Sequence, residues 1–251
     1  MMTSPSSLTM VVPTYNEAVR LDVEAMLAFL ELDQGYRLLF VDDGSSDGTP
    51  AVLETLRRRA PERIGVQCNS ANQGKGEVVR QGLLMALDAG AAMAGFIDAD
   101  LSAPFSEVAA LRDELRANPE LWAAFGSRIK LLGRRVKRSE LRHYFGRVFA
   151  TAASVTLRLG VYDTQCGLKL FRSTPEVRRV LAAPFISRWI FDVELLARLS
   201  EAAGAAISAR VREVPLECWQ ERGASRLKLR DFLRAPIELL QIRRRHPPRH
   251  G

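Results

Sequence analysis

Short apolar runs alternate with amphipathic segments through the first half of the chain. Four apolar runs predict strands, at 8–12, 36–41, 64–68 and 94–97. Between and after them, apolar residues recur at helical spacing, near 17–32, 47–60, 76–89 and 105–117. Two later strands are predicted at 122–126 and 207–215. This alternation is typical of parallel βαβ units, so we expect an α/β fold with a single Rossmann-like, mostly parallel sheet flanked by helices.

Polar and glycine-rich segments follow the predicted strands. They read PTYNE from Pro13, DDGSSDGT from Asp42, NQGKG from Asn72 and DADL from Asp98. The carboxyl ends of parallel strands meet at one edge, and ligands of open α/β sheets bind in the crevice outside that edge. The sequence therefore predicts a binding site there.

Asp98 and Asp100 are the most informative residues of these segments. They lie on the same face of an extended chain, because side chains alternate with a period of two. Carboxylate ligands suit a hard cation such as Mg²⁺ or Mn²⁺, with water and substrate phosphate at the remaining positions. The alternative is that the pair caps the next helix, with Ser102 and Pro104 as start signals.

The neighbouring motifs also allow two interpretations. Gly74-Lys75-Gly76 permits close approach of a phosphate, but it fits an ordinary turn before a helix equally well. Asp42 and Asp43 fit a turn, although Asp42 ends an apolar run, where a carboxylate needs a partner. The first part of the chain contains neither a GxGxxG fingerprint nor a P-loop.

The composition narrows the class of protein. The 251-residue chain is 47% hydrophobic, which is enough for a core without disulfides. Its three cysteines are too few and too scattered for a disulfide framework or a zinc site, which favours a cytoplasmic protein. No segment matches a signal peptide or approaches the ~18 apolar residues of a membrane span. The net charge of +7 suggests an anionic partner: nucleic acid, nucleotide, phospholipid or phosphorylated substrate.

Together the motifs resemble a known family. VVPTYNEA, VDDGSSDGT, NQGKG and DADLS, in this order and at these spacings, resemble the A-type fold of the inverting glycosyltransferases that use nucleoside-diphosphate sugars. GSR at 126–128, DTQCGLKLF at 163–171 and FDVELL at 191–196 are similar to the polyprenyl-phosphate glycosyltransferases, most of all the dolichyl-phosphate β-glucosyltransferases. The resemblance implies a catalytic domain over 1–230, followed by a C-terminal helix and basic tail over 231–251.

The resemblance also implies roles for individual residues. The nucleotide-sugar side of the pocket is expected to contain Pro13, Tyr15, Glu17, Asp42, Asp43, Lys75 and Asp98. Asp98 and Asp100 would bind the metal, and Asp100 and Asp192 would be catalytic. The acceptor and phosphate side is expected to contain Arg128, Arg138, Asp163, Gln165, Gly167 and Lys169. If FDVELL is helical, Asp192 and Glu194 lie about 200° apart, so at most one faces the crevice, and Asp192 is our choice.

The segment 128–160 is both basic and amphipathic. Between 128 and 147 the chain has eight Lys or Arg residues and one acid, Glu140. Such charge suits an anionic acceptor beside an anionic donor, although a solvated basic face is the alternative for most of these side chains. Apolar residues then recur at helical spacing from Leu141 to Leu159, which fits a helix lying on an anionic membrane surface and equally a core-facing helix. A second such segment lies at 232–240, before three arginines.

The expected function is a metal-dependent, inverting transfer of a hexose, glucose from UDP-glucose, to a polyprenyl (dolichyl or undecaprenyl) phosphate. The protein would associate peripherally with the cytoplasmic face of a membrane. Alternatives with the same fold are GDP-mannose or another nucleotide sugar as donor, and a hydroxyl acceptor, for which Asp192 would act as a base. An alternative of a different class is a non-catalytic, basic nucleic-acid-binding protein. No nucleic-acid partner is expected, since the chain has no RRM, KH or zinc signature.

Overall fold

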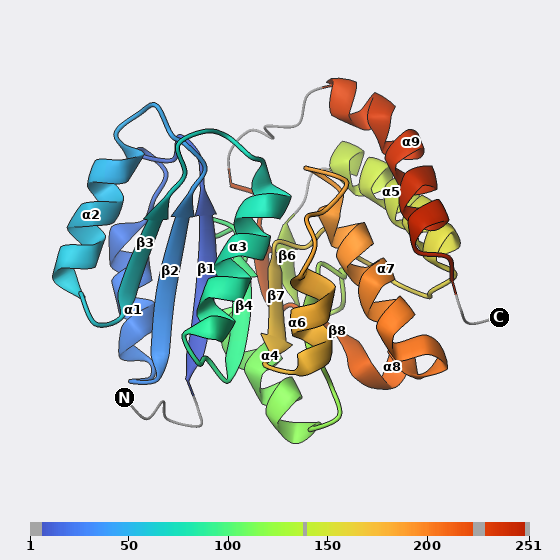
Figure 1. Cartoon of the computed structure of the whole chain (residues 1–251), viewed down its shortest axis with the longest axis horizontal. Helices are drawn as coiled ribbons and strands as arrows, with labels where there is room; N and C mark the ends of the chain where they lie inside the picture. The colour runs from blue at the N-terminus through green and yellow to red at the C-terminus, as the bar shows by residue number, and fades with distance from the viewer. Residues whose placement is uncertain (1–6, 138–139, 223–228, 249–251) are drawn as a thin grey trace.

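The computed structural model describes residues 7–137, 140–222 and 229–248 (Figure 1). Its main sheet has seven strands in the order β3-β2-β1-β4-β7-β5-β8. Their bounds are β1 Leu8–Thr14, β2 Tyr36–Asp42, β3 Ile64–Cys68, β4 Met93–Ile97, β5 Ala123–Ser127, β7 Leu168–Arg172 and β8 Val211–Pro215. Neighbouring strands are parallel except β7, which runs antiparallel between β4 and β5. The predicted single, mostly parallel sheet is confirmed.

Helices cover both faces of this sheet (Figure 1). Their bounds are α1 Val23–Glu31, α2 Thr49–Arg59, α3 Lys75–Asp88, α4 Ser106–Ala117, α5 Glu140–Leu157, α6 Pro175–Leu181, α7 Phe191–Ala203, α8 Ile207–Arg210 and α9 Leu229–Arg245. Alternate residues of β1 show the division: Met10 and Val12 join the core under α1, α2 and α4, whereas Val11 joins the core under α3, α6 and α7. Burial of both faces explains why the central strands are almost continuously apolar.

Two further features lie outside the main sheet. Strands β6 Arg135–Lys137 and β9 Cys218–Gln220 pair in parallel as a small second sheet. Helices α5 and α9 lie beside each other, and α9 also packs against α7 (Figure 1). The predicted boundary between 230 and 231 falls inside α9, and the separation of a catalytic domain from the tail stays a prediction. Within the described ranges, no helix is long and apolar enough to span a bilayer.

Two predicted elements have different bounds in the structure. The helix expected from residue 17 begins at Val23, because Asp22 caps it by accepting a bond from Ala25 N and Glu17 O starts a turn before it. The strand expected from residue 207 begins at Val211, where pairing with β5 starts. Residues 207–210 form α8 instead, since Ser208 and Ala209 have little preference for strands.

Candidate active site

The loops that carry the predicted site converge at one edge of the sheet. Strands β1, β2 and β4 are parallel, so the segments that follow them leave the sheet on the same side. Backbone bonds join these segments: Asp43 N donates to Thr14 O over 2.8 Å, and Asp98 N donates to Gly167 O over 3.0 Å. Because β7 is antiparallel, the segment before it reaches the same edge.

Asp98 and Asp100 lie in the open part of this edge. Their side chains are 36% and 24% exposed, and each faces a cation. Lys75 Nζ lies 2.5 Å from Asp98 Oδ1, and Arg20 Nη2 lies 3.6 Å from Asp100 Oδ2. Burial opposes the charge of Lys75, but the carboxylates of Asp98, Asp192 and Asp100 outweigh burial and raise its pKa.

The pair does not cap the following helix. Asp100 Oδ1 accepts a bond from Ser102 N over 2.9 Å, whereas α4 begins after Phe105 with no side-chain cap. Among the described residues, no cluster of three or more His, Cys, Asp or Glu side chains could hold a metal ion. The two carboxylates nevertheless suit Mg²⁺ or Mn²⁺, which commonly take one or two protein carboxylates and fill the other positions with water and phosphate.

The two aspartates at the end of β2 organise loops. Asp42 is buried, and its carboxylate accepts bonds from Thr14 Oγ1 and Ser45 N. These bonds hold the turn after β2, because a buried carboxylate takes the partners nearest to it, and the predicted contact of Asp42 with the nucleotide stays a prediction. Asp43 accepts bonds from Gln73 N (2.6 Å) and Gly74 N (2.9 Å). Burial raises the pKa of Asp43, although these two bonds oppose the shift.

The other residues predicted on the nucleotide side lie in the segment after β1. Pro13 is half-buried at the end of the strand, and Tyr15 is 39% exposed. Glu17 N donates to Thr49 Oγ1 over 2.8 Å, and the Glu17 carboxylate lies 3.4 Å from Arg20 Nε. These residues follow β1 at the carboxyl edge of the sheet, and their contacts with a nucleotide stay a prediction.

On the acceptor side, Arg128 and Asp163 form a bidentate pair. Arg128 Nε and Nη2 donate to the Asp163 carboxylate over 2.6 and 2.7 Å. Burial disfavours the charge on Asp163, but Arg128 outweighs burial and lowers the pKa of Asp163 to about 2. Asp163 is also buried and holds Arg128, and its predicted role as an acceptor ligand stays a prediction. Arg138 lies outside the described residues.

Two more residues predicted on the acceptor side contact other protein groups. Lys169 is completely buried and donates to Asp192 Oδ1 over 2.5 Å, and its contact with an acceptor phosphate stays a prediction. Gly167 lies against Asp98: a β-carbon built on it would lie 2.1 Å from Asp98 Oδ2, which explains why a glycine stands there. Burial raises the pKa of the Cys166 thiol to about 12, which makes it a packing residue rather than a nucleophile.

Several polar side chains near the Arg128–Asp163 pair are buried, and not all of them were predicted from the sequence. Ser127 Oγ, Thr164 Oγ1 and Gln165 Nε2 are buried without a hydrogen-bond partner among the described residues. Gln165 was predicted, but Ser127 and Thr164 were not. Buried polar atoms of this kind need water or a ligand, and all three belong to segments next to the Arg128–Asp163 pair. The sequence analysis also missed Arg20 and Arg188. Arg188 donates to Asn72, which lies next to the loop bonded to Asp43.

The fold is that of the A-type glycosyltransferases. Its mostly parallel sheet carries acids at the carboxyl edge, Asp98 and Asp100 among them. The chain belongs to glycosyl transferase family 2, whose model matches residues 9–176. It is therefore an enzyme that transfers a sugar.

Individual relatives are more specific. The chain is 31% identical to a dolichyl-phosphate beta-glucosyltransferase of Trichomonas vaginalis, over 95% of this chain and 72% of the relative. It is 35% identical to a protein of the same name from Drosophila melanogaster, over 77% of this chain and 63% of the relative. The chain thus matches only part of the length of these relatives.

Solved structures agree on the fold. Glucosyl-3-phosphoglycerate synthase from Mycobacterium tuberculosis, in complex with Mn²⁺, UDP-glucose and phosphoglyceric acid, aligns with a TM-score of 0.66 at 17% identity, covering 94% of this chain and 79% of that one. A mannosyltransferase from Pyrobaculum calidifontis, in complex with GDP-Man and Mn²⁺, aligns with a TM-score of 0.60 at 19% identity, covering 97% and 66%. At these identities the likeness concerns the fold alone.

Proposed function

We propose that this enzyme transfers glucose from UDP-glucose to a polyprenyl phosphate, such as dolichyl or undecaprenyl phosphate, with inversion at the anomeric carbon. The observation that carries the proposal is the position of Arg128. The guanidinium is bonded to Asp163; burial opposes its charge, but Asp163 and, more weakly, Asp98 raise its pKa. A cation that suits an acceptor phosphate thus stands next to the acids that suit a donor diphosphate. The names of the relatives support glucose and dolichyl phosphate.

Asp98 and Asp100 would hold Mg²⁺ or Mn²⁺, and Lys75 adds a positive charge beside the same position. When bound, the metal would neutralise the charge that develops on the departing diphosphate. The Mn²⁺ complexes of the two solved structures support a divalent cation.

The acceptor chemistry needs charge more than a base. A phosphate monoester has its second pKa near ~6, so the acceptor is already largely ionised at neutral pH. Its oxygen would form a bond to the anomeric carbon while the bond from that carbon to UDP breaks, with no proton to remove. Arg128 would bind the acceptor phosphate, assisted by the Gln165 amide. In this scheme Asp192 positions groups in the crevice and does not act as a base.

Exposed apolar side chains support a membrane surface as the place of action. On α5, Val148 and Val155 are 70% and 64% exposed, on the side opposite the buried Ala153 and Leu157. Of the predicted stripe, Val148, Ala152 and Val155 are exposed, whereas Phe149 is half-buried and packs against the core. On α9, Ile237 is likewise 60% exposed. Helices that keep an apolar side open next to basic residues bind lipid interfaces.

The loop after Arg128 also exposes apolar side chains next to basic residues. At this turn Leu131 is 48% exposed and Leu132 is fully exposed, with Lys130 and Arg134 on either side. This turn begins three residues after Arg128, which would place a bilayer close to the acceptor site. We propose that this surface and the open sides of α5 and α9 rest on the cytoplasmic face of an anionic membrane.

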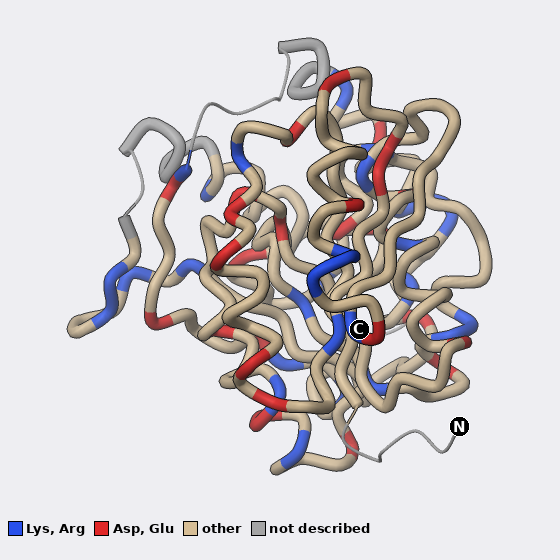
Figure 2. The backbone as a smooth tube through the Cα atoms, turned by 90° about the vertical axis from the view of Figure 1, so that its left-hand side faces the viewer, with Lys and Arg blue, Asp and Glu red and all other residues tan. Residues whose placement is uncertain are grey.

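A nucleic-acid-binding function is less well supported. Figure 2 shows acidic residues interspersed with the basic ones over the described chain. Binding to a phosphate backbone favours a basic face instead.

The experiment that tests the proposal is a donor panel. Purified protein is incubated with Mn²⁺, undecaprenyl phosphate and, in separate reactions, UDP-glucose, UDP-N-acetylglucosamine or GDP-mannose, and lipid products are identified by mass spectrometry. We expect a hexosyl-phosphoryl lipid from UDP-glucose. A product only from GDP-mannose would overturn the donor assignment, and the absence of glycolipid from every donor would overturn the proposal.

A further inference from the structure

Lys169 is a charged residue in the middle of the sheet. It lies on β7, opposite Phe96 of β4 and Phe125 of β5. Its side chain is fully buried, and Nζ lies 5.2 and 5.1 Å from the centroids of these two rings. An ammonium group at such a position is costly unless all its hydrogens are paired, so its presence asks for a specific role.

The partners of Lys169 are all protein groups. Nζ donates to Thr164 O over 3.1 Å, to Cys166 O over 2.7 Å and to Asp192 Oδ1 over 2.5 Å. An ammonium group has three N–H donors, so these three acceptors use all of them. Lys169 therefore has no donor left for a substrate phosphate, and any effect on the reaction must pass through its partners.

Those partners belong to the two segments that surround the crevice. Thr164 and Cys166 lie in the loop between Asp163, which holds Arg128, and Gly167, which bonds to Asp98. Asp192 lies in the first turn of α7, where Ile190 provides no side-chain cap. Lys169 thus bonds both to the carboxylate of Asp192 on α7 and to the loop that ends at Gly167, whose carbonyl accepts a bond from Asp98 N.

We propose that Lys169 is a positioning residue of the transfer reaction, which acts by fixing the Asp192 carboxylate to the 164–167 loop. The buried ammonium ties the start of α7 to the segment that joins the acceptor arginine to the metal-binding pair. Asp192 then keeps one orientation at the crevice while substrates enter. This inference rests on the proposed function, and it replaces the phosphate-binding role that the sequence suggested for Lys169.

The test is a double-mutant cycle on turnover. Lys169→Met, Asp192→Asn and the double variant are assayed with UDP-glucose and undecaprenyl phosphate. We expect Lys169→Met to lower kcat by roughly 100-fold, as misplaced groups do, with KM for UDP-glucose changed less than about threefold. In the Asp192→Asn background, Lys169→Met should have little further effect on kcat, because the group it positions is already altered.

The double variant also guards against misfolding. Lys169→Met alone leaves Asp192 as a buried, unpaired charge, whereas the double variant leaves neither charge and should fold. If the single variant fails to fold, the comparison of the double variant with Asp192→Asn still decides: equal kcat supports positioning through Asp192, and a much lower kcat overturns it.

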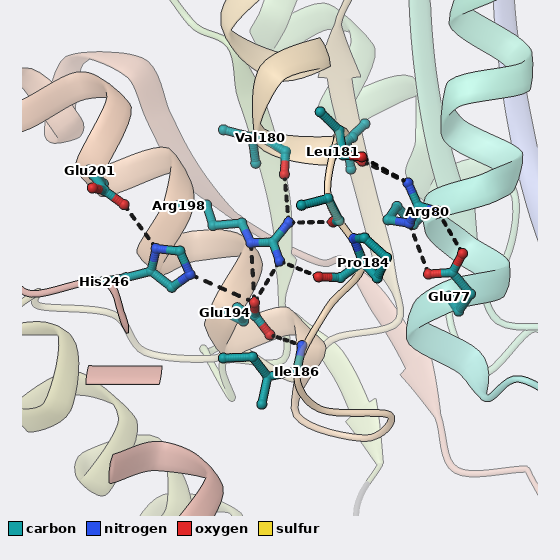
Figure 3. Close-up of polar contacts among 12 residues, drawn as sticks. Glu77, Arg80, Val180, Leu181, Pro184, Ile186, Glu194, Arg198, Glu201 and His246 are labelled. Carbon is teal, nitrogen blue, oxygen red and sulfur yellow. Dashed lines mark hydrogen bonds and ion pairs between the residues drawn. The ribbon is translucent and has the colours of Figure 1, made fainter. Parts of the chain in front are cut away.

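Arg198→Met is the matched control. Arg198 is another buried cation paired with an acid of α7, Glu194, and its other partners are the carbonyls of Val180, Ala183 and Pro184 (Figure 3). This variant should lower the melting temperature and leave kcat unchanged below it. If Lys169→Met behaves in the same way, or if its effect on kcat simply multiplies with that of Asp192→Asn, the positioning role is wrong. A wild-type enzyme that makes no glycolipid would instead overturn the proposed function and the positioning role with it.

Discussion

Helix α7 carries two buried acids two positions apart, and their surroundings differ. Asp192 pairs with the buried Lys169, and Glu194 pairs with the buried Arg198 over 2.6 Å. The two side chains point about 200° apart around the helix axis. Asp192 bonds to Lys169 of β7, whereas Glu194 bonds to Ile186 N and lies near His246 at the C-terminal end of the chain.

The Glu194 side is closed. Glu194 also accepts a bond from Ile186 N, and Arg198 donates to the carbonyls of Val180, Ala183 and Pro184 (Figure 3). These bonds secure the end of α6 and the connection to α7. Burial and ion pairing alone therefore do not mark a functional acid. Asp192 differs from Glu194 because the partly exposed charges of Lys75 and Asp98, here called the open cluster with Asp100, also act on it.

The largest effect is expected at the open cluster. Asp98→Ala combined with Asp100→Ala should lower kcat by about 10³-fold or more, since the charge on the departing diphosphate loses its partner. The unfolding free energy should change little, because both side chains are partly exposed. Steady-state kinetics and urea unfolding measure the two quantities. Asp88→Ala, an exposed acid at the end of α3, is the control, and full activity of the double variant would remove the metal assignment.

The closed cluster should respond in the opposite way. Arg198→Met should lower the unfolding free energy by about 3–5 kcal/mol, because it leaves Glu194 as a buried, unpaired charge. Glu194→Gln in the same chain should recover part of that loss. Urea denaturation measures both variants, and the kcat of the folded enzyme should stay at the wild-type value. A large loss of kcat without a loss of stability would show that the two sides of α7 are not separate.

The next prediction concerns the exposed turn with Leu131 and Leu132, which we propose to contact the membrane. Leu131→Glu combined with Leu132→Glu should weaken binding to vesicles of anionic phospholipid by roughly tenfold, since two apolar side chains would no longer enter the interface. Leu32→Glu, which alters a 65% exposed leucine after α1, at the other edge of the sheet, should have no effect. Vesicle co-sedimentation measures the affinities, and equal losses for both variants would remove the loop from the proposed surface.

The smallest expected effect concerns pH. His246 Nδ1 lies 2.8 Å from Glu201 Oε2, and Nε2 lies 3.7 Å from Glu194 Oε1. The nearby Glu194 carboxylate raises the pKa of His246 above 6.5; burial and the charge of Arg198 oppose this shift, and Glu201 adds to it. A raised pKa means that protonated His246 stabilises the folded state below about pH 6.5, and that this contribution is lost as the pH rises through the folded-state pKa.

His246→Gln tests this sign. The difference in unfolding free energy between wild type and variant should be largest at pH 6 and should shrink toward pH 9. Urea unfolding at several pH values measures it. A difference that does not vary with pH would mean that His246 is neutral in the folded protein.

Some of these features were predictable from the sequence, for identifiable reasons. The strands β1, β2 and β4 are short apolar runs that end in acids or turn residues, so both the fold and the edge with the site were visible. Strand β7 was not predicted, because Lys169 and Arg172 interrupt its short apolar run.

The roles of individual acids were harder to predict than their location. Asp42 and Asp98 both end apolar strands, yet Asp42 is enclosed by Thr14 and Ser45, whereas Asp98 stays open. Likewise, the motif around Asp163 did not indicate that Asp163 holds Arg128. Such differences depend on partners distant in sequence, and a motif does not name those partners.

The central claim is that the acceptor side supplies positive charge to a phosphate and needs no base. The most direct test compares the rate of glucose transfer from UDP-glucose to a polyprenyl phosphate with the rate to the polyprenol of the same length, which lacks the phosphate. We predict transfer to the phosphate and a rate at least ~10³-fold lower for the alcohol, which would need a base to remove its proton. Equal or faster transfer to the alcohol would contradict the account and would assign Asp192 the role of that base.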